Sequence, residues 1–340
     1  MTKVYAFLFA CFIFVSNSHG QEMKPIENLV FEGGGIRGVA YCGALQEMEL
    51  RGKLKHVQRV AGTSSGAITA CLLAVGYQPK ELTEIIGNMN FGKFNDGRGL
   101  VFGGMRRLKK HMGYYKGEKF EIWLENLIEA KTGNKSITFS ELYQLSQRDS
   151  MYKELIVTGT CMNHQEAIYF NRFTYPNMPI SRAVRASMAV PLYYEPVIID
   201  DSGQRIQVKN LGPEHHVCLD GGFVSNYPIW VFDEAPYSFE PYSTLGMRID
   251  KVQQIEMDRA GKYHTLAYPI HSTSDLVGSV YYIMKENLNR QMLDSLDWAR
   301  TISISDAGIG PKVKRLTSEQ KELFLNEGRK GVSHFFENKL

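Results

Sequence analysis

Beyond its first 20 residues, the chain lacks any uninterrupted apolar run of the ~20 residues that a membrane-spanning helix requires. It has only five cysteines, and neither a Cys-x-x-Cys nor a His-x-x-x-His spacing occurs, so we expect no metal site. A strong excess of either charge is also lacking, since the formal net charge is +3 and 22% of the residues are charged. This balance argues against a nucleic-acid-binding protein and against a disordered chain. The 340 residues, 44% of them hydrophobic, are enough for one large core.

The first 20 residues differ in character from the rest. Lys3 is followed by the apolar run Val4–Val15 and then by the small and polar residues SNSHG, which end at Gly20. A basic start, about a dozen apolar residues and a small-x-small ending are typical of a secretory signal peptide. We therefore expect cleavage after Gly20 and a soluble mature protein that is secreted or periplasmic. A lipoprotein signal with Cys11 as acceptor is the weaker alternative, because Phe9 is bulky for that signal and the apolar run continues past Cys11.

Four cysteines would remain in the mature chain, all in apolar or strand-like segments: Cys42, Cys71, Cys161 and Cys218. In an oxidising compartment they could form two disulfides. Buried free thiols that pack as small apolar side chains are the favoured interpretation, because the four are not closely paired along the sequence.

The remainder of the chain alternates between strand and helix patterns. We expect strands over 26–31, 57–62, 155–161, 167–171, 216–219, 243–249 and 301–304, and a hairpin that joins 197–200 to 206–209. Helices are expected over 39–50, 67–75, 116–130 and 181–190, from Pro79 onward, and after a capping box of Thr138 and Glu141. This order is typical of an α/β fold with a mostly parallel sheet covered by helices. We expect a single domain over 21–340, with a core at about 27–250 and a mainly helical part over 251–340.

Residues 91–115 interrupt this alternation. The segment FGKFNDGRGLVFGGMRRLKKHMGYY is rich in glycine, cations and aromatic residues. We expect a long mobile loop or a cap, because long irregular segments inside compact domains are usually functional or disordered. Aromatic side chains that enter a bilayer interface, next to cations that meet anionic headgroups, would allow contact with a membrane. A solvated surface loop is the alternative.

One five-residue motif has the pattern of a serine nucleophile. Gly62-Thr63-Ser64-Ser65-Gly66 fits Gly-x-Ser-x-Gly with Ser64 at its centre, between an apolar strand and an apolar helix. The flanking glycines allow a sharp strand-to-helix turn that exposes the serine hydroxyl. The alternative is a structural turn in which the serine caps the helix.

A serine hydroxyl needs a base, and Asp220 is the candidate. The histidines that follow Ser64 lack a motif of their own: His111, His164, His215, His216, His264, His271 and His334. Asp220 instead follows the apolar stretch HVCL and precedes Gly221 and Gly222, so a carboxylate is expected at a strand end. A common Asp-Gly turn is the alternative for Asp220 alone. Together with Ser64, it suggests a Ser–Asp dyad in which the carboxylate is the base.

The glycine-rich loop at residues 33–38 admits two interpretations. Gly33-x-Gly35-x-x-Gly38 satisfies the dinucleotide-binding spacing, and it also suits a nest of backbone N–H groups for an oxyanion. The dinucleotide motif expects an acidic residue about 20 positions later, at the end of the next strand. Here that strand ends in Gly62, and Glu49 precedes it inside a helix. We therefore expect no nucleotide.

Four motifs in this order resemble the patatin-like phospholipase family, over residues 27–250. They are Gly33-Gly34-Gly35-Ile36-Arg37-Gly38, Gly62-Thr63-Ser64-Ser65-Gly66, Arg185-Ala186-Ser187-Met188-Ala189-Val190-Pro191 and Asp220-Gly221-Gly222. The resemblance implies a three-layer α/β/α fold, a modified α/β-hydrolase. It also implies hydrolysis of lipid carboxylic esters through an acyl-enzyme, of the phospholipase A or lysophospholipase type, without a cofactor.

The resemblance also implies roles for individual residues. Ser64 would be the nucleophile and Asp220 the base, acting without histidine. N–H groups around Gly34, Gly35 and Ile36 would form the oxyanion hole, and Arg37 would close that loop or steady charge. Apart from the resemblance, Arg182 and Arg185 in the helix from Ser181 could meet a phosphate or could equally be exposed helix charges.

The expected partners follow from the same resemblance. They are a phospholipid or lysophospholipid substrate and transient contact with a membrane surface, with neither nucleic acid nor nucleotide. A broad short-chain esterase and a catalytically silent homologue that binds lipid or protein are the alternatives.

Overall fold

The structure, a computed structural model, describes residues 24–97, 102–207, 211–237, 240–284, 288–310 and 315–337. The expected signal peptide, residues 98–101 of the expected loop and the end of the expected hairpin at 208–209 lie outside these ranges.

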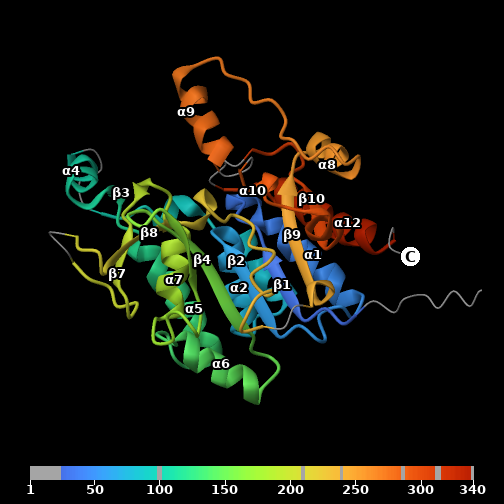
Figure 1. The fold of residues 1–340 in the computed structure, drawn as a ribbon, viewed down its shortest axis with the longest axis horizontal. Helices are drawn as coiled ribbons and strands as arrows, with labels where there is room; N and C mark the ends of the chain where they lie inside the picture. Colours follow the sequence, from blue (N-terminus) through green and yellow to red (C-terminus); the bar gives the residue numbers. More distant parts are fainter. Residues whose placement is uncertain are drawn as a thin grey trace, which may run out of the picture.

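A central sheet organises the described part of the chain (Figure 1). Its strand order is β10 (Thr301–Ser305), β9 (Thr244–Asp250), β1 (Asn28–Phe31), β2 (Arg59–Thr63), β4 (Glu154–Cys161), β8 (His215–Asp220) and β7 (Val197–Asp200). From β10 to β4 all neighbours are parallel, whereas β8 and β7 are antiparallel. The strand β5 (Glu166–Phe170) pairs antiparallel with β4. The fold is therefore α/β with a mostly parallel sheet, as the sequence predicts.

The two faces of the sheet bury alternate residues of its central strands, as the period of a strand requires. Leu29 and Phe31 of β1 belong to the larger core, which includes residues of α1 (Val39–Leu50) and α2 (Ser65–Ala74). Val30 lies in a second apolar cluster with Ala61 and Ile156 of the neighbouring strands, and this cluster is covered by the segment 227–237 and by α11 (Ser295–Ala299). Both faces are thus shielded from water.

Several further helices complete the layers. They are α3 (Pro79–Gly87), α5 (Glu118–Thr132), α6 (Phe139–Arg148), α7 (Ile180–Ser187), α8 (Val252–Arg259), α9 (Thr273–Tyr282), α10 (Leu288–Gln291) and α12 (Ser318–Glu337). The predicted capping box is confirmed: Thr138 Oγ1 accepts the N–H of Glu141, whose carboxylate accepts the N–H of Thr138. Among the described helices, none has the length and hydropathy needed to cross a membrane.

The C-terminal helix packs directly on the first helix of the chain. A Cβ atom on Gly43 of α1 would lie 2.0 Å from the carbonyl oxygen of Leu325, and one on Gly328 of α12 would lie 2.0 Å from that of Ala40. Only glycine allows the two backbones to approach this closely. The pair is visible beside the sheet in Figure 1. The helix α12 is thereby anchored to α1 at the start of the same core.

Of the two alternatives predicted for residues 91–115, the long loop is wrong for the described part, whereas the cap stays a prediction. The segment contains the 3-10 helix η2 (Phe91–Phe94), α4 (Phe102–His111) and β3 (Gly113–Tyr115), which pairs with β6 (Leu192–Tyr194). Phe94 is buried against Phe120 and Trp123, so it anchors the segment to the core. Its glycines serve close packing as well, because a Cβ on Gly104 would lie 2.3 Å from the Tyr114 ring.

Candidate active site

Ser64 lies at a strained turn between β2 and α2. Its backbone angles are φ 53° and ψ −118°, a conformation that side chains rarely adopt. The chain turns this sharply because a Cβ on Gly62 would lie 2.4 Å from the carbonyl carbon of Gly66, and one on Gly66 would lie 2.3 Å from the oxygen of Phe31. The glycines of the predicted motif thus make the turn possible. Ser64 itself is half-buried at the strand end, as a nucleophile that must meet a substrate requires.

A hydrogen bond to Ser187 of α7 holds the turn in place. The N–H of Ser64 donates to Ser187 Oγ at 2.8 Å, and this hydroxyl donates to the carbonyl oxygen of Thr158 in β4 at 2.6 Å. Ser187 is fully buried. A single hydroxyl therefore connects the strained residue to the neighbouring strand.

The strand registers place the end of β8, which is Asp220, next to the end of β2, which precedes Ser64. Thr63, the last residue of β2, pairs with Thr158, and Asp220, the last residue of β8, pairs with Gly159. Both strands therefore use the same edge of β4 and end at consecutive positions along it, from opposite directions. A Cβ on Gly221 would lie 2.9 Å from Thr63 Cγ2, which confirms that the two strand ends meet.

Asp220 is held in position by backbone groups. Its side chain is buried, and Oδ1 accepts the N–H of Gly222 at 2.8 Å, at the start of the 3-10 helix η3 (Gly221–Phe223). Its own N–H donates to the carbonyl oxygen of Ala189 at 3.0 Å. The residue block around Ser187 and Ala189 thus contacts both members of the candidate dyad.

The glycine-rich loop lies against the serine. A Cβ on Gly33 would lie 3.2 Å from Ser64 Cβ. Asn226 clamps this glycine, since its carbonyl oxygen accepts the Gly33 N–H at 3.2 Å and its side-chain amide donates to the Gly33 carbonyl at 3.1 Å. The N–H of Gly34 donates to Ser65 Oγ at 2.9 Å. Gly35 then opens the 3-10 helix η1 (Gly35–Gly38) with φ 61°, which favours glycine.

Arg37 closes the loop, one of the two roles expected for it. Its Nε donates to the carbonyl oxygen of Gly34 at 3.1 Å, and its Nη1 lies 3.9 Å from Asp306 Oδ2. The side chain is buried. At the next loop position, Gly38 packs on the first turn of α2, because a Cβ there would lie 3.2 Å from Ser65 Oγ.

A buried network of charged groups lies at the ends of β1 and β9 beside this loop. Glu32 Oε1 lies 3.0 Å from Arg248 Nη2, and Arg290 Nη2 lies 2.6 Å from Asp250 Oδ1. Burial by itself would raise the pKa of Asp250, but the guanidinium groups of Arg290 and Arg248 outweigh it and hold that pKa below its ordinary value. Asp258 also pairs with Arg290. These charges compensate one another and support the loop.

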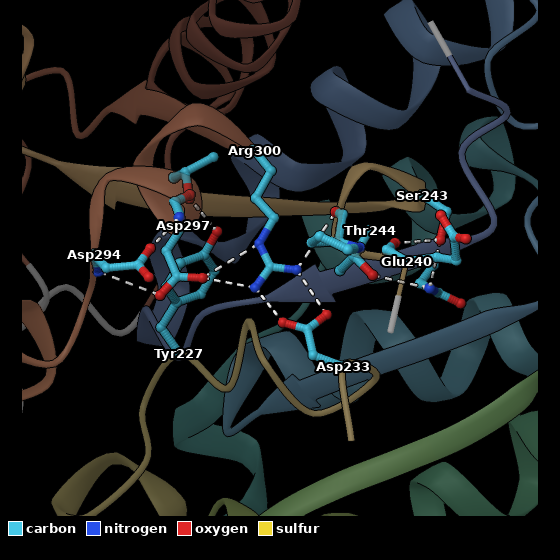
Figure 2. A network of polar contacts seen from close by, with 11 residues as sticks. Tyr227, Asp233, Glu240, Ser243, Thr244, Asp294, Asp297 and Arg300 are labelled. Carbon is cyan, nitrogen blue, oxygen red and sulfur yellow. Dashed lines mark hydrogen bonds and ion pairs between the residues drawn. The ribbon is translucent and has the colours of Figure 1, made fainter. Parts of the chain in front are cut away.

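A second network fastens the segment that follows η3 to the far edge of the sheet (Figure 2). The Arg300 guanidinium lies between Asp233 and Asp297, with Nη1 2.8 Å from Asp233 Oδ1 and Nη2 2.6 Å from Asp297 Oδ1. The Tyr227 hydroxyl is 2.8 Å from Thr301 Oγ1 in the neighbouring strand. The connection between β8 and β9 is therefore held by the Arg300 guanidinium, which binds one carboxylate of this connection, Asp233, and one of α11, Asp297.

The expectation that Arg182 and Arg185 are exposed helix charges is wrong, and contact of either residue with a phosphate stays a prediction. Arg185 is buried and donates to the carbonyl oxygens of Gly117 and Glu195, at 3.1 and 2.8 Å. Arg182 donates to the carbonyl oxygen of Gly203. Burial lowers the pKa of Arg185 to about 10. Both arginines thus bind backbone carbonyls and are not exposed helix charges.

Two of the histidines lie far from the dyad. His215 and His216 are at the opposite end of β8 from Asp220, and His216 lies ~13 Å from it at the rise of a strand. The four described cysteines, Cys42, Cys71, Cys161 and Cys218, are buried and free. Burial raises the pKa of the Cys42 thiol to about 12, so this thiol is an unreactive core group.

The sequence motifs pointed to Ser64 and Asp220 but not to the groups that position them. Asn226 and Glu32 have no local motif, and Ser187 was visible only as part of the Ala-Ser…Pro block. Their roles depend on contacts between distant segments. The sequence also missed a group of potential metal ligands, Cys161, His164 and His216, because His216 comes from a distant segment and Cys-x-x-His alone is a weak signal.

Comparison with known proteins decides the family. The model of the patatin-like phospholipase family matches residues 29–233. The chain belongs to this family. A protein of Bacillus subtilis, YqhO, described as uncharacterised, is 33% identical over 211 residues, which are 60% of this chain and 66% of YqhO. A probable lipid hydrolase, 463L, of Invertebrate iridescent virus 6 is 25% identical over 230 residues, which are 64% of this chain and 69% of the viral protein.

The fold agrees with this membership. The crystal structure of VipD from Legionella pneumophila matches with a TM-score of 0.58 at 19% sequence identity, over 92% of this chain and 67% of VipD. This likeness shows the patatin fold. The match to YqhO spans just under two thirds of that protein's length.

Proposed function

We propose that this patatin-like protein is an exported lipid acyl hydrolase of the phospholipase A or lysophospholipase type, which acts through Ser64 and Asp220. Membership in the family supports lipid esters as the substrate class. One observation supports the dyad: β2 and β8 end at consecutive positions on the same edge of β4, the strained Ser64 follows the end of β2, and the buried Asp220 is the last residue of β8.

The proposed reaction has two steps. Asp220 accepts the proton of Ser64 Oγ while the oxygen attacks the ester carbonyl, and collapse of the tetrahedral intermediate releases the alcohol, which takes up that proton. Water, activated by the same carboxylate, then hydrolyses the acyl-enzyme and releases a fatty acid. In this proposal Asp220 needs no histidine.

The oxyanion would be stabilised by the backbone of the glycine loop. Because the Gly34 N–H already donates to Ser65 Oγ, the proposal assigns the donors to Gly35 and Ile36, at the start of η1. Donors of this kind contribute ~2.7–4 kcal/mol each to the transition state. The bond from Arg37 to the Gly34 carbonyl would keep their orientation fixed before substrate binds.

Contact with a lipid surface is proposed for α4 and α9. Phe102 is 91% exposed and Met105 is 49% exposed on α4, which also has four cations at Arg106, Arg107, Lys109 and Lys110. Leu276 and Val280 are exposed on α9. Figure 1 shows both helices projecting from the body, on the side toward which β9 points. In a sheet of this type that side holds the chemistry.

Export is proposed from the sequence of residues 1–20, with cleavage after Gly20. Mass spectrometry of the protein recovered from the medium or the periplasm tests this directly. A mature N-terminus at Gln21 is expected, and retention of Met1 would contradict it.

The decisive functional experiment compares phosphatidylcholine vesicles with a soluble butyrate ester, using mature wild type and Ser64→Ala. We expect fatty-acid release from vesicles by wild type and at least a ~10⁴-fold loss in the variant. Turnover of the butyrate ester alone would favour the short-chain esterase. The absence of turnover on either substrate by folded wild type would favour the silent lipid- or protein-binding homologue.

A further inference from the structure

A cysteine and two histidines lie together where β4 ends and β8 begins, at the opposite end of β8 from Asp220. Cys161 is the last residue of β4, His164 lies in the turn to β5, and His216 lies at the start of β8. One potential ligand atom of each lies within 4.8 Å of the others. Cys161 Sγ is 3.6 Å from His216 Nδ1, and the two imidazole rings are 4.9 Å apart at an interplanar angle of 83°.

Each imidazole is already oriented through its distal nitrogen. His216 Nε2 is 2.9 Å from Asp201 Oδ1, and His164 Nε2 is 3.0 Å from the carbonyl oxygen of Pro213. These acceptors place the proton on Nε2 and leave the lone pair on Nδ1. A histidine that donates its other N–H to a carboxylate or a carbonyl is the usual arrangement around a bound metal ion.

The separation of the donor atoms matches a small tetrahedral ion. With Zn–S of ~2.3 Å and Zn–N of ~2.05 Å, tetrahedral geometry holds sulfur and nitrogen ~3.6 Å apart. This equals the distance between Cys161 Sγ and His216 Nδ1. One thiolate and two imidazoles form a ligand set suited to Zn²⁺.

We propose that Cys161, His164 and His216 bind one Zn²⁺ ion, with a water molecule in the fourth position. Binding releases the thiol proton of Cys161 to solvent, because the thiolate is the ligand. His164 is exposed and His216 is half-buried, so the ion can enter from the surface.

The backbone around this group is held by Asn163. Its side-chain amide donates to the His215 carbonyl at 2.7 Å, and its Oδ1 accepts the N–H of Val217 at 2.9 Å and the thiol of Cys161 at 3.3 Å. The turn after β4 is thus fastened to β8 before any metal binds. When the thiol loses its proton, Asn163 Oδ1 keeps the bond from Val217.

The ion would have a structural role. In the register between β4 and β8, Cys161 pairs with Cys218 and Gly159 pairs with Asp220. A metal that joins Cys161 to His216 therefore fixes the strand that ends in Asp220, ~13 Å from that carboxylate. The inference does not depend on ester hydrolysis.

The test uses the mature chain, reduced, freed of metal with a chelator and then titrated with Zn²⁺ alone against a chromophoric competitor. We expect one ion per chain and an increase of Tm on binding. Co²⁺ in its place should give a thiolate-to-metal charge-transfer band and the intense visible bands of a tetrahedral site. Cys161→Ser should abolish the charge-transfer band, and His216→Ala should abolish stoichiometric binding.

Two further variants separate binding from folding. Asp201→Asn removes only the acceptor of the His216 N–H and should weaken binding by ~10–100-fold. Cys218→Ser is the matched control, because it removes the cross-strand cysteine and should leave affinity unchanged. Circular dichroism confirms that each variant is folded.

Three results would overturn the proposal. They are no stoichiometric binding by folded wild type, binding that survives both Cys161→Ser and His216→Ala, and a Cys161–Cys218 disulfide in the protein recovered from cells, detected by peptide mass mapping.

Discussion

The sheet has a parallel part and an antiparallel part, and the two parts come together along one edge of β4. In the parallel part, β2, β1, β9 and β10 run in the direction of β4, and their glycine turns provide the strained Ser64 and the loop of backbone amides. In the antiparallel part, β8 continues along the same edge of β4 from the opposite direction, so its last residue, Asp220, lies where β2 finishes. If β8 ran parallel to β4, its last residue would lie beside Cys161, at the far end of the pairing from the end of β2.

The parallel and antiparallel parts of the sheet also differ in the contacts of their acidic side chains. In the parallel part, buried arginines are paired with carboxylates, as in the fork of Arg300 with Asp233 and Asp297. At the end of the antiparallel strand, Asp220 accepts a backbone N–H from Gly222. The carboxylates that pair with Arg300 hold the fold together, whereas the proposal gives Asp220, at its strand end, the exchange of a proton with Ser64. Substitutions in either part of the sheet test this difference.

The largest effect is expected from Asp220→Asn. It keeps the shape of the side chain and the bond from Gly222 but removes the proposed base, so kcat should fall by ~10⁴-fold with little change of Tm. Initial rates on phosphatidylcholine vesicles, with Tm from calorimetry, measure both quantities. A variant with wild-type kcat would show that another group is the base.

Arg300→Met acts at the far edge of the parallel part of the sheet. It removes the partner of the buried Asp297 and the half-buried Asp233, and loss of one member of a buried ion pair costs ~3–5 kcal/mol of unfolding free energy. Urea unfolding measures this loss, and kcat per folded molecule should remain within twofold of wild type. A large fall of kcat with unchanged stability would contradict the division between the two networks.

Ser187→Ala tests the hydroxyl that joins the Ser64 turn to β4. It removes the acceptor of the Ser64 N–H and the donor to the Thr158 carbonyl, both buried, so we expect a loss of ~1–3 kcal/mol and a lower kcat. The exposed Ser202→Ala, in the turn after β7, is the control and should stay within ~0.5 kcal/mol of wild type. Equal effects of the two substitutions would remove the positioning role of Ser187.

The smallest effect is expected from Phe102→Ser on α4. Activity on vesicles should fall a few-fold while turnover of a soluble ester is unchanged, because only an interface contact is lost. Leu50→Ser is the matched control, since Leu50 is 80% exposed at the end of α1. Identical ratios of vesicle to soluble activity in both variants would exclude α4 from the membrane surface.

The sequence predicted what depends on local pattern. The helix over 39–50 is observed with the same bounds, and the turns at Ser64 and Asp220 were visible because their glycines lie within a few residues. The roles of Asn226 and Ser187 and the pairing of Cys161 with His216 depend on contacts between segments that are distant in the sequence, which no local pattern contains. The loop alternative for residues 91–115 was wrong because glycines such as Gly104, which serve close packing, resemble loop residues in a sequence.

The central claim is tested most directly by labelling mature protein with a fluorophosphonate and locating the adduct by mass spectrometry. The serine oxygen displaces fluoride and forms a bond to phosphorus, so the adduct identifies the nucleophile. We predict a single adduct on Ser64, formed at least ~10²-fold more slowly in Asp220→Asn. An adduct on any other residue, or an equal labelling rate in Asp220→Asn, would contradict the proposed dyad.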